Sequence, residues 1–213
     1  MQFEWINFYS EFATKLLEFK NNRAKLIADI QSAYSAINMK LPKLEREDSI
    51  IDIDPFTVFG LFNKGITNAN RIAILESFAT VFKIKSKVPN NFDGIPVLNN
   101  LKATYYGFKD DRQAADIDNL WGLYESAINL AEKDDAANRE IFTKWYDTVH
   151  DQLGIRWNIT MGLYWIRPYE FINLDSINRG FIVDPDNMPV DFVNSVKKKL
   201  NKVPYASEYL AIK

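Results

Sequence analysis

The segment IRWNITMGLYWI, residues 155–166, decides the fold class of this chain. Its apolar residues occupy every second position: Ile155, Trp157, Ile159, Met161, Leu163 and Trp165. Strict alternation over this length is typical of a β-strand with one buried face, because successive side chains of a strand point to opposite sides. We expect EFINL (170–174) and FIV (181–183) to add two strands, with a turn at DSINRG (175–180). The sequence therefore predicts a small antiparallel sheet near 155–183.

Elsewhere the apolar residues recur at steps of three and four, which is typical of amphipathic helices. This spacing predicts helices over about 3–37, 55–83 and 117–153, with a bend at 21–23, and a C-terminal helix that carries Phe192, Val193, Val196 and Leu200 before a tail. The fold class is thus α+β and predominantly helical. We expect a single domain over 1–213, in which a helical part (1–154) precedes a small β-containing part (155–213).

The stretch FGLFNKGIT, residues 59–67, has the two glycines and the hydroxyl residue of a phosphate-binding loop. A Walker A loop follows a buried strand and carries a Lys where this chain has Ile66. The preceding Asp-Pro pair (54–55) instead predicts a helix start, Gly65 suits a left-handed position after that helix, and Thr67 can cap the next one. We therefore expect a helix–turn–helix corner that binds no nucleotide.

Composition narrows the classes of function. The 213 residues carry a net charge of −2, no cysteine, and a single histidine, His150. These counts exclude disulfides, thiolate metal sites and His-based zinc sites. The slight negative charge argues against non-specific coating of nucleic acid but leaves room for a small specific site. The basic clusters KIKSK (83–87) and KKKLNK (197–202) are interpreted as solvated helix ends.

Neither a signal peptide nor a membrane span is predicted. The N-terminus MQFEWINFYSEF lacks a basic start and a cleavage site, and no apolar run reaches the roughly 18–20 residues of a span. We expect a cytoplasmic protein with no membrane partner.

No set of residues predicts catalysis. IDID (51–54) offers two carboxylates, but Asp54 is explained as a helix cap, and EFK (18–20) lies inside an amphipathic helix. His150 near a helix end is interpreted as structural or solvated. We expect no catalytic residue, no metal site and no cofactor in this chain, and a nuclease function is disfavoured.

Polar and aromatic side chains gather in the predicted β region. The candidate DNA-binding residues are Tyr164, Trp165, Arg167, Tyr169, Asn173, Asn178 and Arg179. Asn and Arg read base edges or phosphates, and aromatic faces stack on bases, so this mixture suits an exposed or extruded base. The structural alternative stays open: Asp175 and Asn178 are ordinary turn residues, Arg179 can pair with Asp175, and Trp157 and Trp165 can be core.

Four long stretches resemble the N-terminal region of bacterial McrB-like proteins, the GTP-hydrolysing AAA+ subunits of modification-dependent, 5-methylcytosine-specific restriction systems. They are FEWINFYSEFATKLLEFKNNR, DPFTVFGLFNKGIT, FDGIPVLNNLKATYYGF and WNITMGLYWIRPYEFINLDSINRGFI, which together extend from about Phe3 to Ile182. The resemblance implies a recognition domain that binds modified or site-specific DNA. It also implies a GTPase module and a McrC-like nuclease partner. No complete Walker A motif occurs in these residues, so the chain resembles the recognition domain alone.

A second reading uses the same helices differently. The acidic balance and the many amphipathic helices also suit a protein-interaction or regulatory module that makes no DNA contact. The two readings differ in whether the chain distinguishes one DNA duplex from another.

Overall fold

The chain folds as a succession of helices, and the computed structural model describes all residues except 1–2, 48, 101–103 and 213. In chain order, the helices of the described residues are α1 (Ile6–Leu16), η1 (Leu17–Phe19), α2 (Arg23–Ala36), α3 (Pro55–Gly60), α4 (Asn68–Phe82), α5 (Asp116–Glu132), α6 (Ala136–His150), α7 (Asn158–Ile166), α8 (Ser176–Ile182), α9 (Val190–Val196), η3 (Lys199–Asn201) and α10 (Ala206–Ile212). Among these residues there is no sheet, and one isolated bridge joins Lys64 to Leu98.

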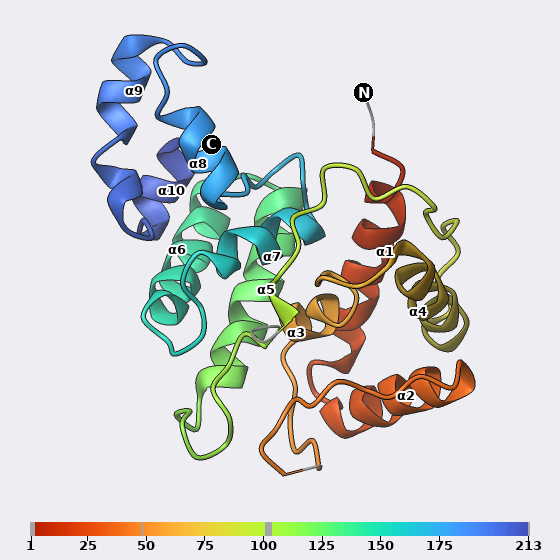
Figure 1. The fold of residues 1–213 in the computed structure, drawn as a ribbon. Coiled ribbons are helices and arrows are strands. Elements are labelled where there is room, and N and C mark those ends of the chain that lie inside the picture. Colours follow the sequence, from red (N-terminus) through yellow and green to blue (C-terminus); the bar gives the residue numbers. More distant parts are fainter. Residues whose placement is uncertain (1–2, 48, 101–103, 213) are drawn as a thin grey trace.

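The predicted antiparallel sheet near 155–183 is wrong, because its strongest segment forms helix α7. The alternating apolar residues of α7 are buried, but so are the intervening Thr160, Gly162 and Ile166. Helices α1, α3 and α5 all pack on α7, which lies in the middle of the molecule (Figure 1). A helix covered on every side needs no polar face, so alternation along it says nothing about its period.

The other two predicted strands are also absent. Residues 170–174 lie in the non-helical connection between α7 and α8, and 181–183 include the end of α8. The predicted β-containing part, 155–213, is therefore helical, and the fold is not α+β. The predicted C-terminal helix is found as α9, but the predicted tail contains the further helix α10.

The predicted helices upstream of 154 are confirmed, each as a pair. The region 3–37 divides into α1 and α2 near the predicted bend, where Asn22 caps α2 by accepting a hydrogen bond from the Lys25 amide. The region 55–83 contains α3 and α4, and 117–153 contains α5 and α6. The segment VLNNLKATYYGF (97–108), which from sequence can start a short helix or strand, lies partly outside the described residues, at 101–103.

The two helix starts around FGLFNKGIT are formed by the predicted caps. Asp54 Oδ1 accepts hydrogen bonds from the amides of Phe56 (2.8 Å) and Thr57 (3.0 Å). Thr67 Oγ1 accepts one from the amide of Asn70 (3.2 Å). The segment is therefore a corner between α3 and α4, preceded by a helix rather than a strand.

Gly65 does not adopt the left-handed conformation that we predicted. Helix α3 ends at Gly60, so Gly65 lies too far along the chain to cap it. Among the described glycines, the left-handed ones are Gly94 (φ +75°) and Gly154 (φ +96°). Gly94 lies in a turn at DGIP (93–96), where a glycine and a proline favour a turn from sequence alone, and Gly154 lies in the reversal between α6 and α7.

A cluster of phenylalanine rings holds the N-terminal helices together. The Phe12 ring of α1 lies with its centroid 5.3–5.9 Å from four other rings, those of Phe59, Phe62, Phe78 and Phe82. All five side chains are buried. Because burying one such side chain contributes about 1.5–3 kcal/mol, this cluster is a principal reason why α1, α3 and α4 associate.

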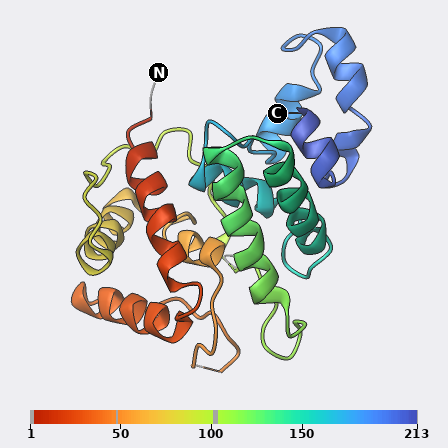
Figure 2. The ribbon, with the colours of Figure 1, turned by 180° about the vertical axis from the view of Figure 1, so that it is seen from behind.

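Figures 1 and 2 show how the helices are distributed. Helices α1, α2 and α4 occupy one side, α5–α7 the middle, and α8–α10 project at the opposite end. Helices α5 and α6 form an antiparallel pair that separates the C-terminal helices from the N-terminal ones. None of the described helices combines the length and the apolar composition that crossing a bilayer requires.

Candidate functional site

Two of the seven predicted DNA-binding residues, Trp165 and Arg167, hold other parts of the protein together through hydrogen bonds. Trp165 is fully buried, and its indole Nε1 donates to the carbonyl oxygen of Pro96 (2.9 Å). The Arg167 guanidinium donates to Ser10 O (3.3 Å), Thr14 Oγ1 (2.9 Å) and Ile166 O (2.8 Å), which joins the end of α7 to α1. Burial lowers the pKa of Arg167 from its ordinary value. We assign both residues to the scaffold.

The predicted asparagines bond within their own segment. Asn173 Nδ2 donates to Asp175 Oδ2 (2.7 Å), and Asn173 Oδ1 accepts from the Asp175 amide (3.1 Å). Asp175 Oδ1 caps α8 by accepting from the Asn178 amide (2.9 Å), and Asn178 Nδ2 donates to Asn173 O (3.0 Å). These bonds are those of a helix start, so both amides shape the entrance to α8.

The structure brings three predicted residues to one cavity. Tyr164, Asn173 and Asn178 line a space of about 460 Å³ together with Phe3, Gly94, Ile172, Phe181, Ile182 and Met188. We call it the asparagine cavity. Tyr169 lies apart on the surface, 66% exposed. The walls of this cavity are mainly apolar, so it suits an apolar group better than a base with several polar edges.

The seventh residue, Arg179, belongs to a different arrangement. Its guanidinium carbon lies 3.7 Å from the centroid of the Trp157 ring, and its Nη1 donates to Leu174 O (2.6 Å). Arg179 and Asp175 form no ion pair within 4 Å, contrary to the alternative considered from sequence. Burial lowers the pKa of Arg179, opposed by the charge of Asp175. Trp157 is half-buried and borders a second cavity.

We call this second space the Trp157 cavity. It measures about 500 Å³ and is lined by Thr104, Tyr106, Gly107, Phe108, Asp111, Leu153, Gly154, Arg156, Trp157 and Asn158. One wall is the segment 104–111, and the other is the reversal that leads into α7. Tyr105 joins the two walls, because its hydroxyl donates to Asn158 O (2.9 Å) while its amide donates to Thr57 Oγ1 (2.9 Å).

Two residues that line the cavity, Gly154 and Arg156, have an unusual backbone conformation. Gly154 (φ +96°) and Arg156 (φ +43°) both have left-handed backbones, which reverse the chain between α6 and α7. This conformation costs a non-glycine residue about 1 kcal/mol or more, and such costs concentrate at functional sites. The Arg156 side chain is exposed, and it has no hydrogen-bond or ion-pair partner among the described residues. The unpaired guanidinium of Arg156 is therefore one of the groups that border the cavity.

Each aromatic ring of the cavity carries an arginine. Besides Arg179 on Trp157, Arg112 lies 4.9 Å from the centroid of the Tyr106 ring and Arg46 lies 5.9 Å from that of Phe108. Arg112 pairs with the buried carboxylate of Glu45, and Arg46 pairs with Asp111 (2.7 Å). Guanidiniums over ring faces fix the rings in place. With Arg156, four arginines surround the cavity.

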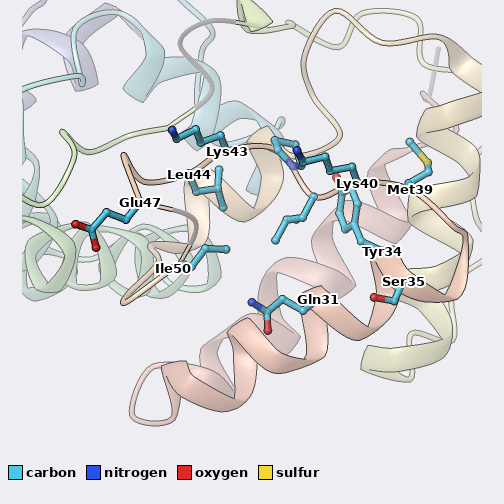
Figure 3. Close-up of a pocket in the computed structure, with 11 residues that line it drawn as sticks. Gln31, Tyr34, Ser35, Met39, Lys40, Lys43, Leu44, Glu47 and Ile50 are labelled. Carbon is cyan, nitrogen blue, oxygen red and sulfur yellow. The ribbon is translucent and has the colours of Figure 1, made fainter.

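Two of the charged residues in these ion pairs, Glu45 and Arg46, come from a strap, residues 39–47, that crosses the surface beside α2. Figure 3 shows the strap and a further cavity of about 360 Å³ beneath it, lined by Gln31, Tyr34, Met39, Lys40, Leu44, Glu47 and neighbours. None of the predicted DNA-binding residues lines that cavity. The strap matters here because it carries Glu45 and Arg46 to the wall of the Trp157 cavity.

Sequence reasoning missed most of this site. The sequence indicates Trp157 only as a possible core residue, and it does not single out Tyr106, Phe108, Asp111 or Arg156. The available signal was the run TYYGF (104–108), which is dense in aromatic residues. Chemically, the cavity offers the partly exposed rings of Phe108 and Trp157, the Asp111 carboxylate as an acceptor, and the unpaired Arg156 guanidinium. The described residues include no group of carboxylates and His suited to a metal ion.

Comparison with known proteins gives one result. The model of the family described as "Domain of unknown function (DUF8425)" matches residues 5–212, which is nearly the whole chain. No curated protein is significantly similar to the chain, and neither is any solved structure.

Proposed function

The chain belongs to DUF8425, and we propose that it is a DNA-recognition domain whose Trp157 cavity takes a nucleobase. In this proposal the chain recognises modified or site-specific DNA for a separate AAA+ GTPase and a McrC-like nuclease, in the cytoplasm. The chain itself contributes recognition and no catalysis. The proposal combines the resemblance to McrB-like N-terminal regions with the geometry of the cavity.

The observation that carries the proposal is the ring of aromatic and cationic side chains. Three aromatic residues line one cavity, and a guanidinium covers each ring. A volume of about 500 Å³ is within the range of small-ligand sites. Stacking of a base on an aromatic ring contributes about 1–3 kcal/mol, and fixed rings lose little entropy when they bind.

The polar groups of the cavity favour a base that carries an amino group. A carboxylate accepts hydrogen bonds from the N4 amino group of cytosine, which gives Asp111 a direct role. Arg46 now neutralises Asp111, and DNA phosphates can replace Asp111 as the partner of Arg46. The exposed Leu153 side chain lines the same space and offers an apolar contact for a methyl group. We therefore expect methylated cytosine to be preferred.

Fluorescence anisotropy with labelled duplexes tests the proposal. Methylated, hemimethylated and unmethylated duplexes of one sequence are titrated with the protein at several salt concentrations. We expect one methylated form to bind at least about tenfold more tightly than the unmethylated duplex, with affinity falling as salt rises. Binding that is negligible for all three at low salt would remove DNA recognition from consideration.

The runner-up function is a protein-interaction module, and a specific surface favours it. Ile177 is 80% exposed and Phe181 52% exposed, one helical turn apart on α8, and Phe181 also lines the asparagine cavity. Exposed apolar side chains next to an apolar cavity are typical of protein-binding surfaces. Under this reading Ile177→Ser with Phe181→Ser abolishes partner binding and leaves DNA affinity unchanged. Under our proposal the cavity variants described below change DNA affinity instead.

A further inference from the structure

We infer that the lysines of KKKLNK, namely Lys197, Lys198, Lys199 and Lys202, bind the phosphate backbone of the DNA whose base occupies the Trp157 cavity. The inference rests on the proposed function and adds to it a second contact surface, with a nucleic-acid backbone as its partner. It replaces our interpretation of this cluster as a solvated helix end.

The first argument is that these charges are not neutralised. Lys197, Lys198 and Lys202 are exposed and Lys199 is partly exposed, within six residues at the end of α9. Within the part of the chain that the structure describes, none of the four has a carboxylate oxygen within 4 Å. The dipole of α9 attracts cations only over its last turn, so it does not account for four of them.

The other basic cluster, KIKSK, lies next to two carboxylates. The Glu11 carboxylate accepts hydrogen bonds from the amides of Lys85 and Ser86, both at 2.7 Å. Lys87 lies 3.7 Å from Glu4. Glu11 thus binds the backbone of this cluster, and Glu4 pairs with one of its lysines, Lys87. The two clusters look alike in sequence, but KIKSK has one ion-paired lysine and a carboxylate bound to its backbone, whereas none of the four KKKLNK lysines has a carboxylate oxygen within 4 Å among the described residues.

The second argument is position, which the His150 side chain fixes. His150 Nε2 lies 2.9 Å from Val203 O, and the His150 and Tyr205 rings stack with centroids 4.1 Å apart. The Tyr205 hydroxyl lies 3.5 Å from Asp151 Oδ2, and Lys202 Nζ lies 5.6 Å from the Tyr205 ring centroid. The lysine segment is thus attached directly to the end of α6.

That attachment places Lys202, the last lysine of the cluster, near the segment that leads from α6 into the cavity. Gly154, which lines the Trp157 cavity, is three residues after Asp151, so their Cα atoms are at most about 11 Å apart. A DNA strand covers a span of this size in about three base steps, at 3.4 Å per step, so the end of α6 and the cavity lie within reach of one short stretch of strand. Two carboxylates around Tyr205 already accept hydrogen bonds from backbone amides: Asp147 from that of Ala206 and Glu208 from that of Tyr205. A strand with a base at the cavity therefore has its neighbouring phosphates near the cluster.

The salt dependence of DNA binding tests this inference. The full chain with Lys197→Gln, Lys198→Gln and Lys202→Gln is compared with the matched control Lys83→Gln, Lys85→Gln and Lys87→Gln. Both variants lose three positive charges. Each phosphate contact contributes about 0.9 to the slope of log affinity against log salt, so we expect the KKKLNK variant to lower that slope by about 2–3. Its affinity should fall for every duplex alike, by more than about tenfold at low salt, with the preference for the methylated duplex kept.

The outcomes separate this inference from the proposed function. An unchanged slope in the KKKLNK variant, with duplex preference intact in the wild type, would overturn the inference and leave the proposed function standing. Equal loss in both variants would show an effect of net charge alone and would also overturn it. No binding of wild type to any duplex would end both. Tighter binding to vesicles of anionic lipid than to any duplex would reassign the lysines to a membrane surface, against the inference.

Discussion

The Arg179 guanidinium lies over the Trp157 indole, with its carbon 3.7 Å from the ring centroid. Asp175 caps the start of α8, and Arg179 follows it one turn later. There the Arg179 Nη1 donates a hydrogen bond to Leu174 O. The contact joins α8 to the residue before α7 and fixes one wall of the Trp157 cavity. The pair thus connects a helix start, which local sequence determines, to the candidate site.

Arg179→Lys tests this contact, since a lysine keeps the charge but cannot stack a planar group on the ring. A cation–π contact contributes about 0.5–2 kcal/mol, so we expect the melting temperature to fall by about 2–6 °C. Acrylamide should also quench more of the tryptophan emission. An unchanged melting temperature together with unchanged quenching would show that the stack is not maintained in solution.

Two substitutions of Arg156 distinguish the effect of its charge on DNA binding from the effect of its strained backbone on stability. Arg156→Ala removes the cation but keeps a Cβ at φ +43°, whereas Arg156→Gly removes both. We expect both variants to lose DNA affinity to the same extent. The free energy of unfolding of the glycine variant should be about 1 kcal/mol larger than that of the alanine variant, because glycine adopts the left-handed backbone without strain. Urea denaturation and anisotropy measure the two effects. Retained affinity in both variants would exclude Arg156 from the interface.

Arg167 is predicted to act on stability alone. Its guanidinium bonds to Ser10, Thr14 and Ile166, so Arg167→Ala breaks the connection between α1 and α7. We expect a loss of about 1–3 kcal/mol in the free energy of unfolding, with the ratio of affinities for methylated and unmethylated duplexes unchanged. A changed ratio without a change in stability would return Arg167 to the DNA-contacting set.

Asp54 gives a pH dependence whose sign is fixed by its burial. Burial raises the pKa of Asp54 to about 6, outweighing the hydrogen bonds from Thr57 and Phe56, and its Oδ2 has no hydrogen-bond partner among the described residues. Because the folded-state pKa exceeds the unfolded value of about 3.8, the folded state binds more protons between these pH values. Asp54 therefore contributes stability that is full below about pH 4 and is lost as the pH rises through about 6.

Asp54→Asn removes this titration and keeps an oxygen that can cap α3. We expect the stability of the variant relative to wild type to increase from pH 4 to pH 7, by on the order of 2–3 kcal/mol. Chemical denaturation across that range measures the difference. A constant difference at all pH values would mean that Asp54 keeps its ordinary pKa in the fold.

The parts of the fold that could be predicted from sequence are those with local causes. Asp54 and Thr67 accept from nearby amides, so their caps are determined by a few neighbouring residues. The amphipathic helices upstream of 154 have one buried face, so their period is visible. Helix α7 could not be recognised in this way, since neighbours on all sides bury both its alternating and its intervening residues.

The candidate site was predictable only in part, for a related reason. Arg179 was selected because of its chemistry, and the structure places it on a ring of the cavity. The opposite wall, with Tyr106 and Phe108, lies about 50 residues before Trp157 in sequence. Arg46, which contacts the Phe108 ring, comes from farther still. Nothing local in the sequence indicates that these segments meet, because tertiary packing alone brings them together.

The most direct test of the central claim is photo-cross-linking of the full chain to a duplex with 5-iodocytosine at the methylated position, followed by mass spectrometry of the cross-linked peptides. The account predicts adducts on Tyr106, Phe108 or Trp157, and their loss when an unlabelled methylated duplex competes. Adducts confined to other aromatic residues, such as Tyr34 or Phe181, would contradict the claim that the Trp157 cavity holds the base.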